Sequence, residues 1–283
     1  MQNMIKAKDL RSVIMGILKW ILLIVLAIYT IFPLLWLFVT SLKTNAEYFR
    51  SPFSFPATPQ WHNFVDAFVS AGMGRQILNS VVVAFGAVFL NLLLSGMAAY
   101  AISRYRFRAR EGIFLAFSLG VMIPLNAFMI PYYRMYSTFH LLDSHLGLIL
   151  LYASINMPMS IFIIRGFMDT FPRELEEAAE IDGLGFFGRF FKMVFPLTKN
   201  GFVTAGTFAF ITCWNEFVYA NLLLNTAAKR TIQTGVRWFT NEFTTDYVRL
   251  YAAICVAIAP SLLIYFLFQE QVISGLTVGA VKG

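Results

Sequence analysis

The sequence predicts an all-α membrane protein with six transmembrane helices and a helix–turn–helix segment between the fourth and the fifth. Of its 283 residues, 58% are hydrophobic and only 13% are charged, whereas ordinary globular chains carry roughly 25% charged residues. Six stretches are apolar over the length of about 20 residues that a bilayer requires. Helices are expected because lipid cannot satisfy open backbone N–H and C=O groups.

The predicted spans are distributed over the whole chain. They cover residues 13–42, 77–102, 113–136, 146–167, 201–224 and 250–268. The first is basic and then apolar for longer than the core of a signal peptide, so we expect it to remain as an uncleaved span. No linker or low-complexity tract separates the spans. The sequence therefore predicts one transmembrane domain over 1–283, with a core at about 77–270.

The basic residues gather in alternate loops and predict the orientation of the chain. They flank the first span, fill the link between the second and third, and recur between the fourth and fifth and in the tail: Lys6, Lys8, Arg11, Lys19, Arg104, Arg106, Arg108, Arg110, Arg165, Arg173, Arg189, Lys192, Lys199 and Lys282. The positive-inside rule then places both termini in the cytoplasm. A net charge of +7 is also compatible with nucleic acid, but we interpret the arginine cluster as a topology signal beside anionic headgroups.

Prolines occur inside several spans, at Pro33, Pro124, Pro131, Pro158 and Pro260. Each removes a backbone hydrogen bond and tends to kink its helix. Most are explained by the higher frequency of proline in membrane helices. Pro124 and Pro131 lie in one span with Asn126 between them. They fit a helix that is bent around a cavity as well as they fit the general frequency of proline in membrane helices.

The link between the fourth and fifth spans is a polar island. Five of the 15 acidic residues lie within nine of its positions, 174–182: Glu174, Glu176, Glu177, Glu180 and Asp182. Pro172 suits the first turn of a helix, and the carboxylates that follow complement the helix dipole. We expect Gly183 and Gly185 to break this helix, and 186–194 to form a second helix that Pro196 ends.

The first helix of the island has a shallow apolar face made by Leu175, Ala178 and Ala179, which lie at helical spacing. Two alanines allow another surface to approach closely. A generic amphipathic surface helix is the alternative. The pattern Glu-Ala-Ala, three residues, then Gly favours a specific contact, and a soluble segment in so apolar a chain predicts a soluble partner.

The island resembles a known family. Glu177-Ala178-Ala179, Asp182-Gly183 and Phe195-Pro196-Leu197 resemble the "EAA" loop in the permease subunits of bacterial ABC importers. Three further motifs support the resemblance: Ala98-Ala99-Tyr100-Ala101 leading into Arg104-Tyr105-Arg106-Phe107, Trp214-Asn215-Glu216-Phe217, and a tail with Gln271, Gly275-Leu276-Thr277 and Gly279-Ala280-Val281-Lys282-Gly283. The chain is similar, over nearly its whole length, to carbohydrate-uptake permeases typified by the smaller maltose-transporter permease subunit. Asn200 departs from the proline that relatives often have.

The resemblance implies a permease subunit in the bacterial inner membrane that imports a sugar. It implies a second permease subunit, two ATP-hydrolysing subunits and an extracytoplasmic solute-binding protein as partners. Segment 171–197 would be the coupling segment, and the ATPase-coupling positions carried over are Glu177, Ala178, Ala179, Asp182 and Gly183. ATP and Mg²⁺ would bind to the partner ATPase, and this chain would bind no cofactor and be no enzyme.

The fifth predicted span contains a polar group of residues, Asn215, Glu216 and Asn221. A carboxylate at the centre of a membrane helix costs about 2.5–3.5 kcal/mol on insertion scales, so Glu216 is expected to face the bundle or a water-filled path. Amide and carboxylate groups can hydrogen-bond sugar hydroxyls, which makes these residues candidates for lining the substrate path. An interhelical polar clamp is the equal alternative.

No residue pattern predicts chemistry in this chain. The nearest match to a phosphate-binding loop, 183–190, has Arg189 and Phe190 where lysine and Ser/Thr are needed. The three histidines are scattered among loops. Cys213 and Cys255 fall inside predicted spans and are expected to be inert small hydrophobes. We therefore predict neither a catalytic centre nor a metal site.

The polar stretch 225–249 is, by resemblance, a contact for the binding protein, and a solvated loop is the alternative.

Three other functions remain open. A stand-alone secondary transporter or channel would work without ATPase partners. A membrane-embedded enzyme would need an acidic or histidine companion for Glu216 at the same depth, which the sequence lacks. A permease for another solute, such as phosphate or peptide, fits the sugar-type motifs less well.

Overall fold

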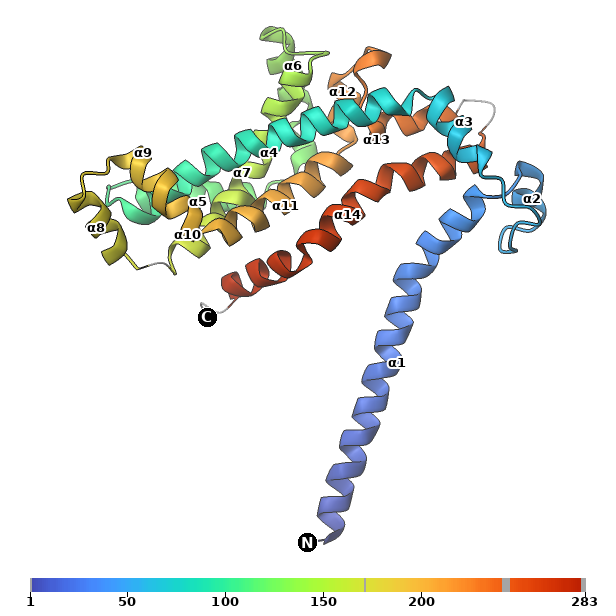
Figure 1. The fold of residues 1–283 in the computed structure, drawn as a ribbon, viewed down its shortest axis with the longest axis horizontal. Helices are drawn as coiled ribbons and strands as arrows, with labels where there is room; N and C mark the ends of the chain where they lie inside the picture. The colour runs from blue at the N-terminus through green and yellow to red at the C-terminus, as the bar shows by residue number, and fades with distance from the viewer. Residues whose placement is uncertain (1, 171, 241–244, 281–283) are drawn as a thin grey trace. The chain divides into compact units, whose positions relative to one another are not determined.

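The computed structural model describes residues 2–170, 172–240 and 245–280, and it describes them as helices and connecting loops (Figure 1). The elements in chain order are α1 (Gln2–Ser41), α2 (Asn45–Arg50), α3 (His62–Ser70), α4 (Met73–Arg104), α5 (Arg110–Gly120), η1 (Leu125–Phe128), α6 (Met129–Thr138), α7 (His145–Met168), α8 (Glu174–Ile181), α9 (Phe186–Arg189), η2 (Phe190–Val194), α10 (Phe195–Leu197), α11 (Lys199–Asn215), α12 (Val218–Leu223), η3 (Ala227–Lys229), α13 (Ile232–Gly235), η4 (Val236–Phe239) and α14 (Tyr247–Ala280).

Four helices of the described chain are long and apolar enough to cross a membrane. They are Ser12–Ser41 within α1, the whole of α4, the whole of α7, and Tyr247–Ile273 within α14. These helices coincide with the first, second, fourth and sixth predicted spans. An all-α protein with several membrane-length helices is therefore confirmed.

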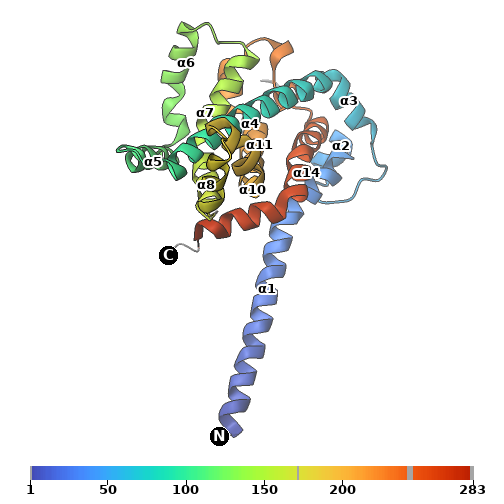
Figure 2. The same cartoon turned by 60° about the vertical axis from the view of Figure 1, so that its left-hand side comes forward.

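The third predicted span is a bent pair of helices. Arg110–Gly120 and Leu125–Thr138 meet at 97°, and if the pair counts as one span the structure has five. Figure 2 shows α6 turning away from α5. The bend follows from Pro124, which has an extended ψ of 117° at the start of η1 and no N–H to continue a helix. The predicted bend is thus present, and the cavity that it was expected to enclose stays a prediction.

The expectation of one continuous helix over 201–224 is wrong. Helix α11 ends at Asn215, Glu216 has an extended ψ of 124°, and α12 begins only at Val218. With 17 residues, α11 falls short of the length needed for a span by itself. Glu216 therefore lies at a break between two helices and not at the centre of one.

The chain divides into two compact units, Met1–Ser70 with Trp238–Cys255, and Ala71–Arg237 with Val256–Gly283. In the first unit, Tyr48 stacks on Tyr247 with ring centroids 5.1 Å apart, and Arg249 forms an ion pair with Asp66 at 2.8 Å. The most apolar stretch of α1 has no buried residue, so it remains available to lipid or to another chain.

The second unit is built on α4, α7 and α11, which pack against one another along their lengths (Figure 1). Small residues permit the close approach: a side chain at Gly96 of α4 would meet Phe202 of α11 at 2.5 Å. A buried polar clamp joins α4 to α7. Asn91 donates to the Ala153 carbonyl at 2.9 Å and accepts from the Ser160 hydroxyl at 2.7 Å, so no polar atom of its amide group is left unpaired.

Asp143 joins the loop after α6 to the segment that follows α12. Its carboxylate accepts from the backbone N–H groups of Asn225 at 3.0 Å and Thr226 at 2.9 Å, from the Thr226 hydroxyl at 2.7 Å, and from Lys229 Nζ at 3.1 Å. The Thr226 side chain and backbone hold the pKa of Asp143 well below its usual range. Residues 225–229 are thus held in place by Asp143.

We expect Asp143→Asn to lower the thermal stability of the purified protein at pH 7. Asparagine tolerates the left-handed φ of 51° at this position, so the substitution mainly removes the charge. Because the folded pKa is depressed, the stabilisation is present above the unfolded pKa of about 3.9 and is lost as pH falls further. The difference in melting temperature between the two proteins should therefore shrink from pH 7 to pH 3. Glu174→Gln is the control, and a pH-independent difference would contradict the prediction.

Candidate functional site

Residues 174–197 form the predicted helix–turn–helix, which we call the elbow: α8, a turn, and a second arm of α9, η2 and α10. Three carboxylates lie in the first turn of α8, where they interact favourably with the positive end of the helix dipole. The residue at the start of the predicted segment, Phe171, lies outside the described residues. Within the second unit, the elbow lies beside the end of α4 (Figure 1).

The turn of the elbow depends on Gly183. Its φ is +82°, a conformation that only glycine adopts freely. The Gly183 N–H donates to the Glu180 carbonyl and the Leu184 N–H to the Ala179 carbonyl, both at 3.0 Å. This pair of bonds is a Schellman motif, which satisfies the last carbonyls of α8. The predicted break at Gly183 is confirmed and has a physical cause.

The second arm differs from the prediction at its end. Pro196 was expected to end the helix, but α10 contains it and α11 begins at Lys199. A π-helical turn, η2, directly precedes this position. Since proline cannot donate the usual bond to the carbonyl four residues earlier, a widened turn accommodates it within a helical path. At Pro196 the helical winding therefore changes, and the helical path continues into α10.

The inner face of α8 packs on the end of α4. Glu176 is buried, and one of its oxygens accepts a hydrogen bond from the Tyr100 hydroxyl. Its other oxygen lies 3.3 Å from Arg104 Nε. Ala179, one helical turn further on, is also buried. Tyr100 and Arg104 belong to the last two turns of α4, so the end of α4 determines where α8 lies.

Arg189 joins the two arms of the elbow to each other. It forms an ion pair with Glu180 of α8, and it donates to the Tyr105 hydroxyl at 2.9 Å. Tyr105 follows directly after α4. Arg189 is buried, whereas the Glu180 side chain is 64% exposed, so solvent screens the ion pair and its contribution is modest. The two arms are therefore joined to each other through Arg189, and through Tyr105 to the end of α4.

The outer face of α8 is exposed and partly apolar. Leu175 is 47% exposed and Ile181 is 87% exposed. Ala178 lies between them on the same face and is also exposed. This apolar row, with carboxylates on either side of it, is a surface on which a partner can pack closely.

The structure divides the predicted coupling residues between the two faces. Glu177, Ala178 and Asp182 are exposed, Ala179 is buried, and Gly183 forms the turn. Glu176, the buried carboxylate, is not among the predicted coupling residues. Its spacing from Ala179, three residues earlier and so on the same helix face, was the available signal.

A cavity of about 260 Å³ opens where the elbow meets the end of α4. Four arginines and three glutamates line it, together with one tyrosine: Arg104, Tyr105, Arg106, Arg173, Glu176, Glu177, Glu180 and Arg189. Its walls are therefore strongly charged. Tyr105, Arg106 and Glu177 come from the loop after α4 and from α8, so the cavity changes shape if the elbow moves.

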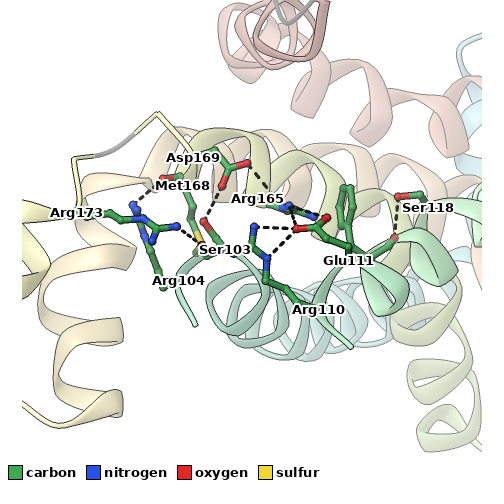
Figure 3. Close-up of polar contacts among 10 residues, drawn as sticks. Ser103, Arg104, Arg110, Glu111, Ser118, Arg165, Met168, Asp169 and Arg173 are labelled. Atoms are coloured by element: carbon green, nitrogen blue, oxygen red, sulfur yellow. Dashed lines mark hydrogen bonds and ion pairs between the residues drawn. The ribbon is translucent and has the colours of Figure 1, made fainter. Parts of the chain in front are cut away.

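Hydrogen bonds and ion pairs connect the start of the elbow to the ends of α4, α7 and α5 (Figure 3). Arg173, just before α8, donates to the Ser103 carbonyl at 3.2 Å, and the Ser103 hydroxyl donates to Asp169 at 2.7 Å. Arg165 lies 3.7 Å from Asp169 and 3.3 Å from Glu111 of α5. The ends of α4, α5 and α7 are thus connected to the start of the elbow by polar contacts.

The second predicted set of residues lies at the break between α11 and α12. The carboxylate of Glu216 accepts from the N–H groups of Tyr219 at 2.8 Å and Ala220 at 3.0 Å, and from the Tyr152 hydroxyl at 2.5 Å. It thereby satisfies N–H groups that begin α12 and have no partner inside that helix. Tyr219 also donates to the Leu125 carbonyl, which links this break to the bend of the third span.

Asn215 and Asn221 are exposed on either side of this break. The side-chain oxygen of Asn215 accepts from the Ser261 hydroxyl at 3.0 Å, and that of Asn221 accepts from Arg237 at 2.8 Å. The structure therefore brings the three predicted path residues together at the break between α11 and α12. They form a site separate from the elbow, because α11 begins at the elbow and ends at the break.

Part of the predicted interaction surfaces falls outside the described residues. Asn241 and Glu242, within the polar stretch 225–249, and Val281–Gly283 of the tail motif are among them. In the described part of the chain, no group of three or more His, Cys, Asp or Glu residues is arranged to hold a metal ion.

The helices of membrane length, together with the polar elbow, define a multi-pass membrane protein. The chain belongs to the family of binding-protein-dependent transport system inner membrane components, whose model matches residues 91–277. This family supplies the membrane part of a transporter and not its catalytic part. The multi-pass membrane location of the chain follows from the family and from its helices.

Individual relatives cover most of this chain. It is 35% identical to the sulfoquinovosyl glycerol transport system permease protein SmoH of Agrobacterium fabrum, over 94% of both chains. It is 32% identical to the diacetylchitobiose uptake system permease protein NgcG of Streptomyces coelicolor, over 92% of this chain and 87% of the relative. The melibiose/raffinose/stachyose import permease protein MelC of Bacillus subtilis is 32% identical, over 89% and 91%.

A solved structure has the same fold. It is that of a bacterial ABC transporter involved in the import of the acidic polysaccharide alginate, and one of its chains matches with a TM-score of 0.80. The match covers 91% of this chain and 96% of that chain, at 22% sequence identity. The all-helical arrangement described above is therefore the fold of an ABC transporter chain.

We expect Gly183→Ala to destabilise the elbow by about 1 kcal/mol, because alanine is strained at a positive φ. Nothing lies within 4 Å of the Cβ that the substitution adds, so backbone strain is the only penalty. Gly185→Ala is a matched control: its φ is −71°, and its added Cβ is equally free. Limited proteolysis of the elbow should be faster in the first variant and unchanged in the second. Equal rates would contradict the assigned role of Gly183.

Proposed function

We propose that this chain is a permease subunit of an ATP-driven, binding-protein-dependent importer for sugars. The cargoes named for its relatives support this proposal, because sulfoquinovosyl glycerol, diacetylchitobiose, and melibiose, raffinose and stachyose are all glycosides. The importer would comprise this chain, a second permease subunit, two ATP-binding subunits and an extracytoplasmic solute-binding protein. ATP and Mg²⁺ would bind to the ATP-binding subunits.

The observation that carries the proposal is the exposed apolar row Leu175, Ala178 and Ile181 on an elbow that is otherwise locked in place. A polar segment of a membrane protein gains nothing from exposing Ile181 to water, since exposed apolar clusters mark contact surfaces. The ATP-binding subunit is the partner that we assign to it. Glu177 and Asp182, exposed beside the row, would add polar contacts at its rim.

The elbow then faces the cytoplasm, with both chain termini on the same side. Six crossings result if the bent pair α5–α6 and the broken pair α11–α12 each cross the membrane once. Tyr219 supports this arrangement, because its bond to Leu125 joins the two interrupted spans to each other. Interrupted helices at membrane depth are tolerated where they line a cavity, which suits a solute path.

The path residues would act in two ways. Asn215 and Asn221 are exposed and offer amide groups to sugar hydroxyls. Glu216 borders the same path, and its carboxylate also holds α12 against Tyr152. The short helix α12 has only 6 residues, so we infer that Glu216 contributes to the shape of the path as well as to its polarity.

We expect Ile181→Asp to weaken binding of the ATP-binding subunit. The substitution removes a central apolar contact and buries a new charge. It should weaken the binding free energy by about 2 kcal/mol, which raises the dissociation constant roughly 30-fold. The chain is expressed with its partner subunits, purified in a mild detergent, and the bound ATP-binding subunit is quantified. The wild-type chain should retain it.

Phe139→Asp is the control, because Phe139 is equally hydrophobic, is 66% exposed, and follows α6 far from the elbow in the sequence. It should retain the ATP-binding subunit. If the wild-type chain transports sugar into liposomes without any ATP-binding subunit, the proposed function is wrong.

We expect a cysteine at Asp182 to be accessible only from the cytoplasm and one at Thr226 only from outside. The native residues Cys213 and Cys255 are first replaced by serine. In right-side-out vesicles that contain this chain alone, a membrane-impermeant maleimide should label the Thr226→Cys protein and not the Asp182→Cys protein. Inverted vesicles should give the opposite result. Labelling of Asp182→Cys in right-side-out vesicles would contradict the orientation.

A further inference from the structure

The four glutamates of α8 have different surroundings, although they lie within two turns of one helix. Glu174, Glu177 and Glu180 are exposed, whereas Glu176 is 7% exposed. A carboxylate loses its hydration when it is buried, and a buried one persists only where charged and hydrogen-bonding partners replace the water. Its burial on so short and polar a helix therefore requires an explanation from its partners.

Both partners of Glu176 come from the last turn and a half of α4. Tyr100 donates its hydroxyl hydrogen to one carboxylate oxygen, and Arg104 Nε lies 3.3 Å from the other. Tyr100 and Arg104 are four residues apart, so they lie one above the other on the same face of α4. The orientation of that face thus determines where the carboxylate of Glu176 can be held.

The partners are themselves held in place. Arg104 donates to the carbonyl of Met168, the last residue of α7, at 2.7 Å. Tyr100 is fully buried, and its ring packs on Phe186 at 5.0 Å and on Phe190 at 5.6 Å between centroids. Tyr100 therefore contacts the first arm of the elbow through its hydroxyl and the second arm through its ring.

The elbow is rigid enough to use this attachment. Arg189 joins its arms through Glu180, and the Schellman turn at Gly183 fixes the angle between them. An elbow whose arms are joined in this way, and whose inner face is tied to α4 through a buried carboxylate, turns α4 when it is displaced. Without that carboxylate contact, the Tyr100 ring packing and the Arg173 bond to the Ser103 carbonyl would remain, and the same displacement would be transmitted to α4 less completely.

We propose that Glu176 is a positioning residue that transmits displacement of the elbow to α4, so that ATP hydrolysis on the partner is coupled to movement of the solute path. The inference rests on the proposed function, since it requires an ATP-binding partner on the outer face of α8. Glu176 lies on the opposite, inner face and is 7% exposed, so its burial against α4 keeps it from the surface that this partner would contact. Its proposed role is to couple movement of the elbow to movement of α4 and not to bind the ATP-binding subunit.

The test measures sugar molecules transported per ATP hydrolysed in liposomes that contain the whole importer with its partner subunits. Glu176→Gln keeps the size of the side chain and removes its charge, which weakens the contact with Arg104. We expect the ATP-binding subunit to remain bound and ATP to be hydrolysed, while the transport-to-hydrolysis ratio falls roughly tenfold, within the range of ordinary allosteric coupling. Glu174→Gln, on the exposed side of the same helix, should keep the wild-type ratio.

A second substitution separates positioning from general destabilisation. Tyr100→Phe removes one oxygen and leaves the ring contacts with Phe186 and Phe190 in place. We expect Tyr100→Phe to lower the transport-to-hydrolysis ratio less than Glu176→Gln does. The double variant should have the same ratio as Glu176→Gln alone, because both changes break the same contact. Glu176→Asp, which keeps the charge, should recover part of the ratio. General destabilisation lowers the amount of assembled importer and not the ratio for each importer.

Two results would overturn the proposal. One is a wild-type ratio in both Glu176→Gln and Tyr100→Phe. The other is loss of the ATP-binding subunit from Glu176→Gln, which would make Glu176 a binding residue. If Glu176→Gln does not fold, the ratio of Tyr100→Phe decides alone. Failure of the wild-type chain to bind any ATP-binding subunit would instead contradict the proposed function, so the two failures are distinguishable.

Discussion

The close packing of α4 against α7 and α11 is the constraint on which the rest of the second unit depends. Gly96 brings the α11 ring of Phe202 against the α4 backbone, and Asn91 fixes α4 to α7 through the Ala153 carbonyl. In a membrane, where apolar burial drives helix association only weakly, close backbone approach and shared polar groups supply that attraction. With α4 fixed, its last turn becomes a rigid site for attaching the elbow.

Several helices of this structure are interrupted, and at each interruption nearby residues accommodate the change in the backbone. Glu216 satisfies the N–H groups at the start of α12, and η2 accommodates Pro196. The Tyr219 hydroxyl meets the Leu125 carbonyl beside the bend of the third span. Polar backbone groups freed inside a bilayer must find partners in the protein. Glu216 and Tyr219 are therefore placed where helices end, whereas Asn91 and Ser160 pair with each other inside α4 and α7.

Short-range sequence signals predicted the parts of the fold that depend on neighbouring residues alone. Apolar length indicated α1, α4, α7 and α14, and Gly183 indicated the turn of the elbow, because its positive φ is a property of one residue. The break at Glu216 could not be predicted in this way. It carries no proline or glycine, and its extended backbone is stabilised by Tyr152, which lies 64 residues away in the sequence.

The same distinction applies to the candidate sites. The residues Glu177, Ala178, Ala179, Asp182 and Gly183 were recognised as a motif, and the structure shows which of them are exposed. Glu176 differs from Glu177 by one position, and only packing against Tyr100 and Arg104 makes it the buried one. A carboxylate-rich helix gives no indication in its sequence of which carboxylate faces inward until the neighbouring helix is in place.

The exposure of Ile181 has a consequence for the cell that makes this protein. A subunit synthesised without its partner would present Leu175 and Ile181 to water, and such apolar surface promotes aggregation and recognition by chaperones and proteases. The steady-state amount of this chain would then follow the supply of its partner. Balanced synthesis of the subunits would be enforced by degradation of the unassembled excess, without any dedicated regulator.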